Sequence, residues 1–206
     1  HRKNGEIMTT QLNWYSMPII LASQSPRRKE ILDMIGLKYE FCPPHYIENN
    51  SIGKSPTTIV IKHALNKAGT VAPRYSKAWI IGADTVVVCK NRILGKPQNE
   101  NEAIQMLKFL SGVEHSVFTG YCVLNSANGR YLKNAVRTRV RFKEIPLAEI
   151  QYYVENYHPL DKAGAYAIQD FSAIFVEKIN GCFYNVVGFP LPAFYEQVKN
   201  ELSICL

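Results

Sequence analysis

Two serines and two arginines stand close together where a strand is expected to pass into a helix. The apolar residues 18–22 predict a buried strand, and the proline at position 26 favours the first turn of a helix. Backbone N–H groups at a helix N-terminus attract phosphate, and hydroxyl and guanidinium groups add donors suited to its oxygens. The side chains that supply them here are Ser23, Ser25, Arg27 and Arg28. Taken alone, the segment is also typical of a serine-capped helix with two solvated arginines.

A lone carboxylate interrupts the most apolar stretch of the chain, residues 79–89. Burying an aspartate without a partner is costly, so we expect Asp84 at a strand end, in a turn or in a cleft that faces a metal ion. In such a cleft it could bind Mg²⁺ or Mn²⁺ directly, or orient an attacking water molecule. An aspartate in a hairpin turn, between strand segments at 79–81 and 86–89, fits the pattern equally well.

Two further segments combine small residues with one group that can recognise a nucleotide. In residues 94–97 the glycine permits close approach and Lys96 could contact a phosphate, although a surface turn explains this short pattern on its own. In residues 161–169 small side chains would let the backbone approach a ligand, and the amide of Gln169 could pair with a base edge. A tight helix or turn with Asp161 as its N-cap remains the alternative for this segment.

Residues 136–143 alternate between basic side chains and apolar or small ones. The basic members are Arg137, Arg139, Arg141 and Lys143. Such a row could follow the phosphates of a nucleic acid, but period-two alternation ordinarily marks the solvent face of a half-buried antiparallel strand, which we expect here. The chain has no G-x-S-x-G, Walker A, G-x-G-x-x-G or H-E-x-x-H motif. Its dispersed histidines show no metal-ligand spacing.

The composition is that of a globular protein with a substantial core. Of the 206 residues, 47% are hydrophobic and 20% are charged, which argues against a disordered chain. No apolar run is long enough to predict a membrane span, and five scattered cysteines without C-x-x-C spacing favour a reducing, cytoplasmic setting. The net charge of +7 is compatible with an anionic partner without identifying it. Residues 1–7 are interpreted as an expression-tag remnant, which leaves 8–206 as one domain.

Strand and helix signals alternate early in the chain, and adjoining strands follow in the middle. Besides the segments already named, strands are expected at 38–42, 93–94, 116–124, 131–142 and 174–179, and helices at 26–36, from 55 onward, at 99–110, 147–156 and 193–202. This order favours a mixed α/β sheet over a purely parallel one.

Five segments, in this order, resemble the motifs of the Maf nucleotide pyrophosphatases. They are LASQSPRR (21–28), IGADTVV (81–87), LGKP (94–97), DKAGAYAIQ (161–169) and INGCFYNVVGFPL (179–191). The resemblance implies a mixed, bent β-sheet flanked by helices in two lobes around a cleft, similar to the inosine-triphosphate pyrophosphatases. It also implies hydrolysis of a nucleoside triphosphate to the monophosphate and pyrophosphate, in a house-cleaning role and with a divalent cation, Mg²⁺ or Mn²⁺. Family members often pair as homodimers.

The resemblance also assigns roles to the residues at matching positions. Phosphate binding falls to Ser23, Arg27, Arg28, Lys67 and Lys96. Asp84 would be the general base or a metal-linked carboxylate, and Glu48 could share the metal with it. This division suits the splitting of a phosphoanhydride, because cations neutralise the phosphates while a carboxylate orients or deprotonates the water.

Base selectivity differs among the branches of that family. Arg27, Thr85 and Gln169 match the branch that acts on dTTP and UTP, whereas a tryptophan at the first position would mark the branch similar to 7-methyl-GTP pyrophosphatases. We therefore expect dTTP and UTP as substrates, with modified pyrimidine nucleotides as further candidates. Two departures are Asp170, where the family commonly has glycine, and Glu48, which is the only carboxylate of its segment. The alternative from a different class is a regulator of cell division that binds nucleic acid.

Overall fold

A computed structural model describes residues 17–48 and 55–201 of the chain, so the expected tag remnant lies outside the described residues. Within these residues seven strands form one sheet in the order β2-β1-β3-β5-β6-β7, with β4 paired to β3 outside this row. The strands are β1 (Ile19–Ala22), β2 (Glu40–Phe41), β3 (Trp79–Cys89), β4 (Arg92–Leu94), β5 (Glu114–Asn125), β6 (Tyr131–Phe142) and β7 (Val176–Asn180). Strand β1 is parallel to β2 and β3, and the other neighbours are antiparallel. The expected mixed sheet is confirmed.

The first four helices begin where local signals in the sequence predict them, whereas the fifth was not expected and the sixth begins two residues earlier than expected. They are α1 (Pro26–Asp33), α2 (Pro56–Val71), α3 (Glu100–Leu110), α4 (Leu147–Tyr157), α5 (Phe183–Val187) and α6 (Leu191–Glu201), with 3₁₀ turns η1 (Ala72–Arg74), η2 (Pro159–Asp161), η3 (Ala163–Ala165) and η4 (Phe171–Phe175). At the start of α2 the side chain of Ser55 accepts a hydrogen bond from the N–H of Thr58. At the start of α3 the side chain of Asn99 accepts one from the N–H of Glu102. Each cap satisfies a backbone donor that the first helical turn leaves free.

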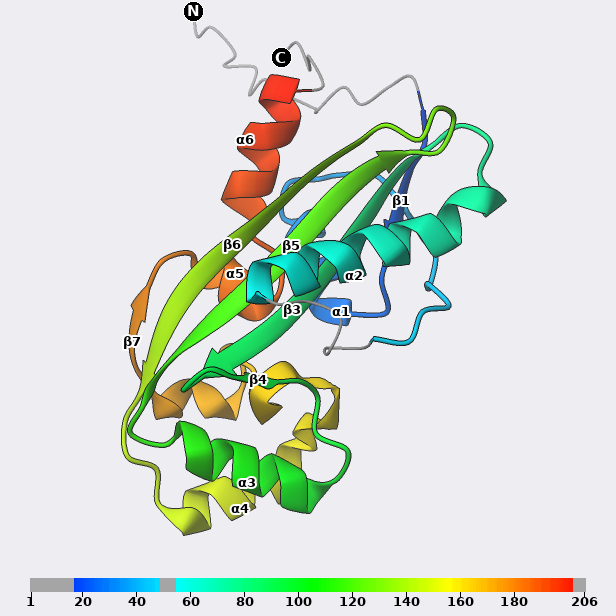
Figure 1. The fold of residues 1–206 in the computed structure, drawn as a ribbon. Coiled ribbons are helices and arrows are strands. Elements are labelled where there is room, and N and C mark those ends of the chain that lie inside the picture. Colours follow the sequence, from blue (N-terminus) through cyan, green and yellow to red (C-terminus); the bar gives the residue numbers. More distant parts are fainter. Residues whose placement is uncertain (1–16, 49–54, 202–206) are drawn as a thin grey trace, which may run out of the picture.

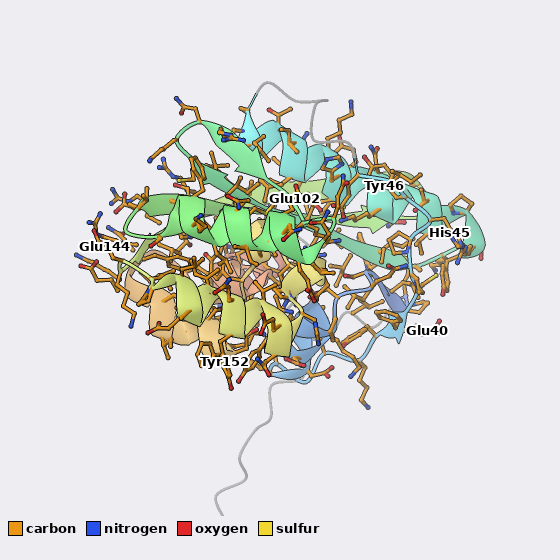
Figure 2. All side chains as sticks on the ribbon, turned by 90° about the horizontal axis from the view of Figure 1, so that it is seen from below. Glu40, His45, Tyr46, Glu102, Glu144 and Tyr152 are labelled. Atoms are coloured by element: carbon orange, nitrogen blue, oxygen red, sulfur yellow. The ribbon has the colours of Figure 1, made fainter. Side chains whose placement is uncertain are left out.

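Two hydrophobic cores lie at opposite ends of one face of the sheet (Figure 1). The first joins β1 and the first half of β3 to α1 and α6, and the second joins the end of β3 to α3 and α4. Helix α2 packs on the other face of the sheet. Helices α3 and α4 lie next to each other, and in the view from below they are the green and yellow helices in front of the sheet (Figure 2). The long strands β3, β5 and β6 therefore run through two lobes, as the sequence resemblance implied.

A break in the pairing along one edge of β3 separates the lobes. Strand β1 pairs with β3 as far as Ala22 opposite Gly82, and β4 pairs with the same edge from Val87 onward. Among the described residues no strand pairs with positions 83–86 on this edge. The chain leaves the sheet there at Ser23, and residues 84–87 of β3 line the cleft that opens beside this break.

Two glycines allow α2 to lie unusually close to the sheet. A Cβ atom on Gly82 would overlap the carbonyl oxygen of Ala64, and one on Gly120 would lie 2.6 Å from the carbonyl carbon of Val60. Because any larger residue would push α2 away, these glycines set the distance between α2 and β3. The side chain of Lys67 on α2 depends on that distance to reach Asp84.

Asp84 lines a cleft, which is one of the positions expected for it. The two other positions, a strand end and a hairpin turn, are wrong, because β5 pairs with β3 along residues 79–88 and β3 is continuous through Asp84. Two further expectations were wrong in detail. The strand expected at 38–42 is limited to β2. The strand expected from residue 174 begins later, because η4 continues to Phe175 before β7 starts.

The alternating strand β6 has the expected solvent face. Thr138, Val140 and Phe142 are buried, whereas the arginines between them are exposed. Two of these arginines have acidic neighbours: Arg139 lies 3.7 Å from Glu114, and Arg141 lies 3.2 Å from Glu177. None of the helices in the described part of the chain is long and apolar enough to cross a membrane.

Candidate active site

A cleft of about 450 Å³ opens at the break in the sheet and has walls from both lobes. This volume is in the range of small-molecule sites. The predicted site residues that line it are Ser23, Arg27, Arg28, Glu48, Lys67, Asp84, Thr85 and Lys96. The fold therefore brings together residues from the loop after β1, the first turn of α1, the segment after β2, the middle of α2 and β3, and the loop after β4.

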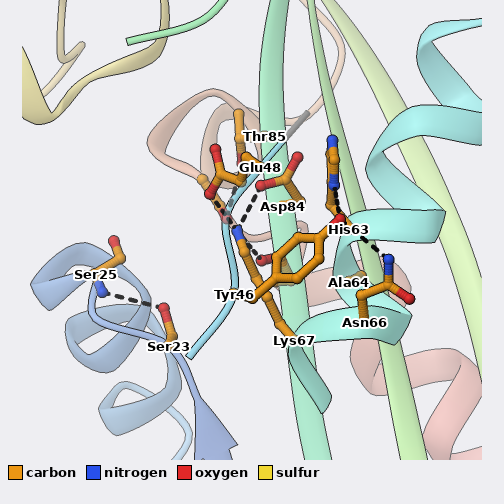
Figure 3. A network of polar contacts seen from close by, with 12 residues as sticks. Ser23, Ser25, Tyr46, Glu48, His63, Ala64, Asn66, Lys67, Asp84 and Thr85 are labelled. Atoms are coloured by element: carbon orange, nitrogen blue, oxygen red, sulfur yellow. Dashed lines mark hydrogen bonds and ion pairs between the residues drawn. The ribbon is translucent and has the colours of Figure 1, made fainter. Parts of the chain in front are cut away.

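At the centre of this cleft one lysine joins two carboxylates (Figure 3). The Nζ atom of Lys67 lies 2.6 Å from Oδ1 of Asp84 and 2.7 Å from Oε1 of Glu48. The side chains of Lys67 and Asp84 are 8% and 3% exposed, so these charges are held almost out of water. The ammonium group of Lys96 lies 3.8 Å from the same oxygen of Glu48, and its side chain is exposed. Two acids and two lysines thus face one another at this point of the cleft.

The two carboxylates have opposite electrostatic environments. Burial raises the pKa of Asp84, and the nearby Lys67 opposes this effect without cancelling it. Burial would also raise the pKa of Glu48, but the charges of Lys67 and Lys96 outweigh it and lower that pKa to about 2. A carboxylate with a raised pKa is the better proton acceptor when ionised, whereas one with a lowered pKa remains an anion. This difference favours Asp84 over Glu48 as a general base.

The same carboxylates are the candidates for holding a divalent cation. The Oδ2 atom of Asp84 is buried and has no hydrogen-bond partner, so it retains lone pairs that a cation could use. Within residues 17–48 and 55–201 no group of three histidine, cysteine or acidic side chains could hold a metal ion. Mg²⁺ commonly binds one or two protein carboxylates and completes its shell with substrate phosphates and water. Glu48 and Asp84 fit a cation of this kind, shared with a bound nucleotide.

The start of α1 does not have the serine cap that the alternative interpretation of its sequence required. Ser25 is the N-cap residue, but its side chain makes no capping hydrogen bond. The Oγ atom of Ser23 instead accepts hydrogen bonds from the N–H of Ser25, at 3.1 Å, and from Nη1 of Arg28, at 3.3 Å. The loop and the first turn of α1 line the cleft, so this helix N-terminus is available to an anion.

Arg28 is buried and its donors are engaged inside the protein. Its Nε donates to the carbonyl oxygen of Gly188 at 3.0 Å, and its Nη2 donates to Oγ1 of Thr85 at 3.2 Å. Burial lowers the pKa of its guanidinium group. With the bond to Ser23, these contacts tie the loop after β1 to β3 and to the segment after α5. Arg28 shapes the site in this way, and its expected direct contact with phosphate remains a prediction.

Arg27 connects the two lobes across the cleft. Its Nη1 lies 2.9 Å from Oδ2 of Asp161, and Nζ of Lys162 lies 2.7 Å from the other oxygen of that carboxylate. Asp161 and Lys162 both line the cleft, as do Tyr46 and Tyr166, and none of these four was expected there as a site residue. The charged pair belongs to a segment already singled out by its composition, whereas nothing in the sequence around Tyr46 indicates its position.

The three residues expected to choose the base are not all in the cleft. Thr85 and Arg27 line it, but Gln169 does not and is exposed. The neighbouring Asp170, the departure noted in the sequence, accepts hydrogen bonds from the N–H of Ser172 at 2.9 Å and from the hydroxyl of Tyr153 at 3.1 Å. These bonds fix the turn in which Gln169 points outward. A role for Gln169 in base selection remains a prediction without geometric support.

Comparison with known proteins finds one family, and relatives with a named activity, over nearly the whole chain. A family described as "Maf-like protein" matches residues 18–201. The chain is 48% identical over 187 residues to the dTTP/UTP pyrophosphatase of Thermotoga maritima, with 90% of each chain covered. It is 44% identical over 186 residues to the enzyme of that name from Syntrophus aciditrophicus, covering 90% of this chain and 91% of the relative. It is 42% identical over 198 residues to that of Bacillus cereus, covering 96% and 93%.

Proposed function

The chain belongs to the Maf family, and from this premise we propose that it is a pyrophosphatase that hydrolyses dTTP and UTP to the monophosphate and pyrophosphate. The observation that carries the proposal is the cluster in which Lys67 contacts both Asp84 and Glu48 inside the cleft. Such a cluster provides a base, an anion for a cation to bind, and a cation for phosphate within one small volume. Relatives that are 40–48% identical carry the name dTTP/UTP pyrophosphatase, which supports the substrate class.

In the proposed reaction the nucleotide lies with its phosphates toward the loop after β1. A water oxygen attacks the α-phosphorus, the bond between that phosphorus and the bridging oxygen to the β-phosphorus breaks, and pyrophosphate leaves. Asp84 accepts the proton of the water, for which its raised pKa suits it. Lys67, Lys96 and the N-terminus of α1 balance the charge of the phosphates. A divalent cation, when bound by Glu48 and Asp84, would neutralise further charge and polarise the phosphoryl group.

A nucleic-acid-binding function has weaker support. The arginines that could follow a phosphate backbone lie on β6, and two of the three that face solvent within this strand are already paired with Glu114 and Glu177. The cleft lies elsewhere and mixes acids with bases, which suits a small anion together with a cation.

A screen of nucleoside triphosphates in the presence of Mg²⁺ or Mn²⁺, with release of pyrophosphate as the measurement, tests the proposal. We expect dTTP and UTP to be hydrolysed, and Asp84→Asn to lower kcat by about a thousandfold or more while the protein stays folded. If no canonical or modified nucleotide is hydrolysed, the proposed activity is wrong. Hydrolysis confined to 7-methyl-GTP would refute the pyrimidine assignment alone. Near-native activity of the variant would remove Asp84 from its role as base.

A further inference from the structure

Two buried polar atoms at the edge of the site lack a hydrogen-bond partner among the described residues. One is Oδ2 of Asp84 on β3, and the other is Nε2 of His63 on α2, the helix that packs against β3. His63 is 1% exposed and Asp84 is 2% exposed, so neither atom is satisfied by bulk water. Buried polar groups without a partner are rare, because each costs free energy of desolvation. Their occurrence on facing elements beside the proposed base therefore requires an explanation.

The contacts of Tyr46 favour one of the two tautomers of the His63 ring. Nδ2 of Asn66 donates to the hydroxyl oxygen of Tyr46 at 3.1 Å, which leaves the hydroxyl hydrogen free to be donated onward. That hydroxyl lies 2.7 Å from Nδ1 of His63. If the hydroxyl donates to Nδ1, the hydrogen of the neutral ring lies on Nε2. The unpartnered nitrogen is then a donor that faces an acceptor, the unpartnered carboxylate oxygen.

The packing of α2 on the sheet places this donor toward Asp84. His63 precedes Lys67 by one helical turn, so both side chains lie on the face of α2 that contacts the sheet. Gly120, the cross-strand neighbour of Asp84, lies against the backbone of Val60, one turn earlier in α2. Along α2, His63 thus lies between Lys67, which contacts Asp84, and Val60, which lies against Gly120. In Figure 3 the oxygen of Asp84 that does not bind Lys67 points to the side on which the His63 ring lies.

We propose that His63 is a positioning residue for Asp84, acting through one water molecule that accepts from Nε2–H and donates to Oδ2. The bridge fixes the second oxygen of a carboxylate whose first oxygen is held by Lys67. A carboxylate oxygen has two lone pairs, so Oδ2 can accept this bond with one and keep the other toward the cleft, for either the reacting water or a cation. Fixing both oxygens keeps the proton-accepting lone pair aimed at the reacting water. The inference rests on the proposed function, since it deepens the role of Asp84 in it.

A competing role for His63 is purely structural. Through Nδ1 it holds Tyr46, and Tyr46 lies two residues before Glu48. Two amide variants separate the roles. In His63→Gln the side-chain nitrogen reaches the place of Nε2, whereas in His63→Asn the shorter amide reaches only the place of Nδ1 and can keep the bond to Tyr46.

The test compares kcat and KM of the wild type with those of both variants, with Lys62→Gln on the exposed side of α2 as the control. We expect His63→Gln to retain kcat within about threefold and His63→Asn to lose about tenfold, both with KM near that of the wild type. The reverse order, or equal values for the two variants, overturns the proposal in favour of the structural role. The control is expected to match the wild type.

A second readout does not depend on turnover. Two-bond ¹H–¹⁵N spectra of the histidine-labelled wild type, without nucleotide or metal, report which ring nitrogen carries hydrogen. We expect the Nε2–H tautomer for His63 in the wild type. In Tyr46→Phe, which removes the donor to Nδ1, we expect a mixture of both tautomers. An Nδ1–H tautomer in the wild type overturns the inference whether or not the protein hydrolyses nucleotides. A wild type with the expected tautomer but without any turnover contradicts the proposed function instead.

Discussion

The ammonium group of Lys67 lies 2.6 Å from the carboxylate of Asp84, a residue 17 positions later in the chain and on another element of the fold. The same group contacts Glu48, from the segment after β2. Three charges from three segments thus meet where the sheet is open along one edge. Because the pair with Asp84 is almost fully buried, removing either partner leaves a charge without compensation.

Replacing Lys67 with methionine should therefore change both stability and cation binding. The unpaired carboxylates should lower the free energy of unfolding by about 3 kcal/mol or more, and they should bind Mn²⁺ more tightly because the competing positive charge is gone. Calorimetric titration with Mn²⁺ and chemical unfolding with and without the ion would measure the two effects. Lys62→Met, on the exposed side of the same helix, is the control. Unchanged Mn²⁺ affinity would show that Glu48 and Asp84 do not hold the cation.

Arg27→Trp tests the side chain that joins the lobes. The arginine is partly exposed and its partner Asp161 is more so, so loss of the ion pair should cost less than about 1 kcal/mol of stability. Activity should respond more strongly, because the cation at the cleft is lost and a bulky ring takes its place. We expect kcat/KM for dTTP and UTP to fall at least about tenfold. Lys29→Trp, in the same helix but outside the cleft, should leave stability and kcat/KM unchanged. If Arg27→Trp has the same selectivity for pyrimidine over other triphosphates as the wild type, other residues choose the base.

Gly82→Ala tests whether the close approach of α2 positions Lys67. The added methyl group would overlap the carbonyl oxygen of Ala64, and such overpacking typically costs about 1–3 kcal/mol. We expect this loss of stability together with a fall in turnover, since α2 must move away from β3. Gly69→Ala in α2 is the control, since a Cβ atom there meets nothing within 4 Å, and it should stabilise the protein by about 0.5–1 kcal/mol. If Gly82→Ala has the stability and turnover of the wild type, the spacing of α2 is not set by Gly82.

The buried His115 should make stability depend on pH. Burial lowers the pKa of this histidine from 6.5 to about 4, and its Nε2 lies 2.8 Å from the hydroxyl of Tyr166, which lines the cleft. Between these two pH values the unfolded chain binds a proton that the folded protein does not. Stability is therefore lost as the pH falls through this window, by up to about 3 kcal/mol.

His115→Gln keeps a hydrogen-bonding group beside Tyr166 but cannot titrate. Unfolding free energies measured from pH 7 to pH 4 should decline less for this variant than for the wild type, by about 3 kcal/mol at the acid end. His45→Gln, at an exposed position, should follow the wild-type curve. Parallel curves for wild type and His115→Gln would mean that the buried ring is protonated with little cost.

The sequence alone was sufficient for the family and for most of the elements, although it missed α5 and overestimated the length of β2. Local signals do not depend on distant contacts, so Pro26 and Ser55 marked helix starts, and the alternation along β6 identified its solvent face. The five ordered motifs predicted a mixed sheet with two lobes, which the structure has. They also singled out most of the residues that line the cleft.

The contacts among those residues were decided only by the tertiary structure. Whether Asp84 ends a strand or lies in its middle depends on pairing with β5, and its bond to Lys67 depends on how closely two glycines let α2 approach. The same applies to Gln169. Hydrogen bonds made by the neighbouring Asp170 fix the turn in which Gln169 is exposed outside the cleft. Motif order records which side chains are present. Distances of a few ångströms between segments follow from sheet register and helix packing, which no single segment encodes.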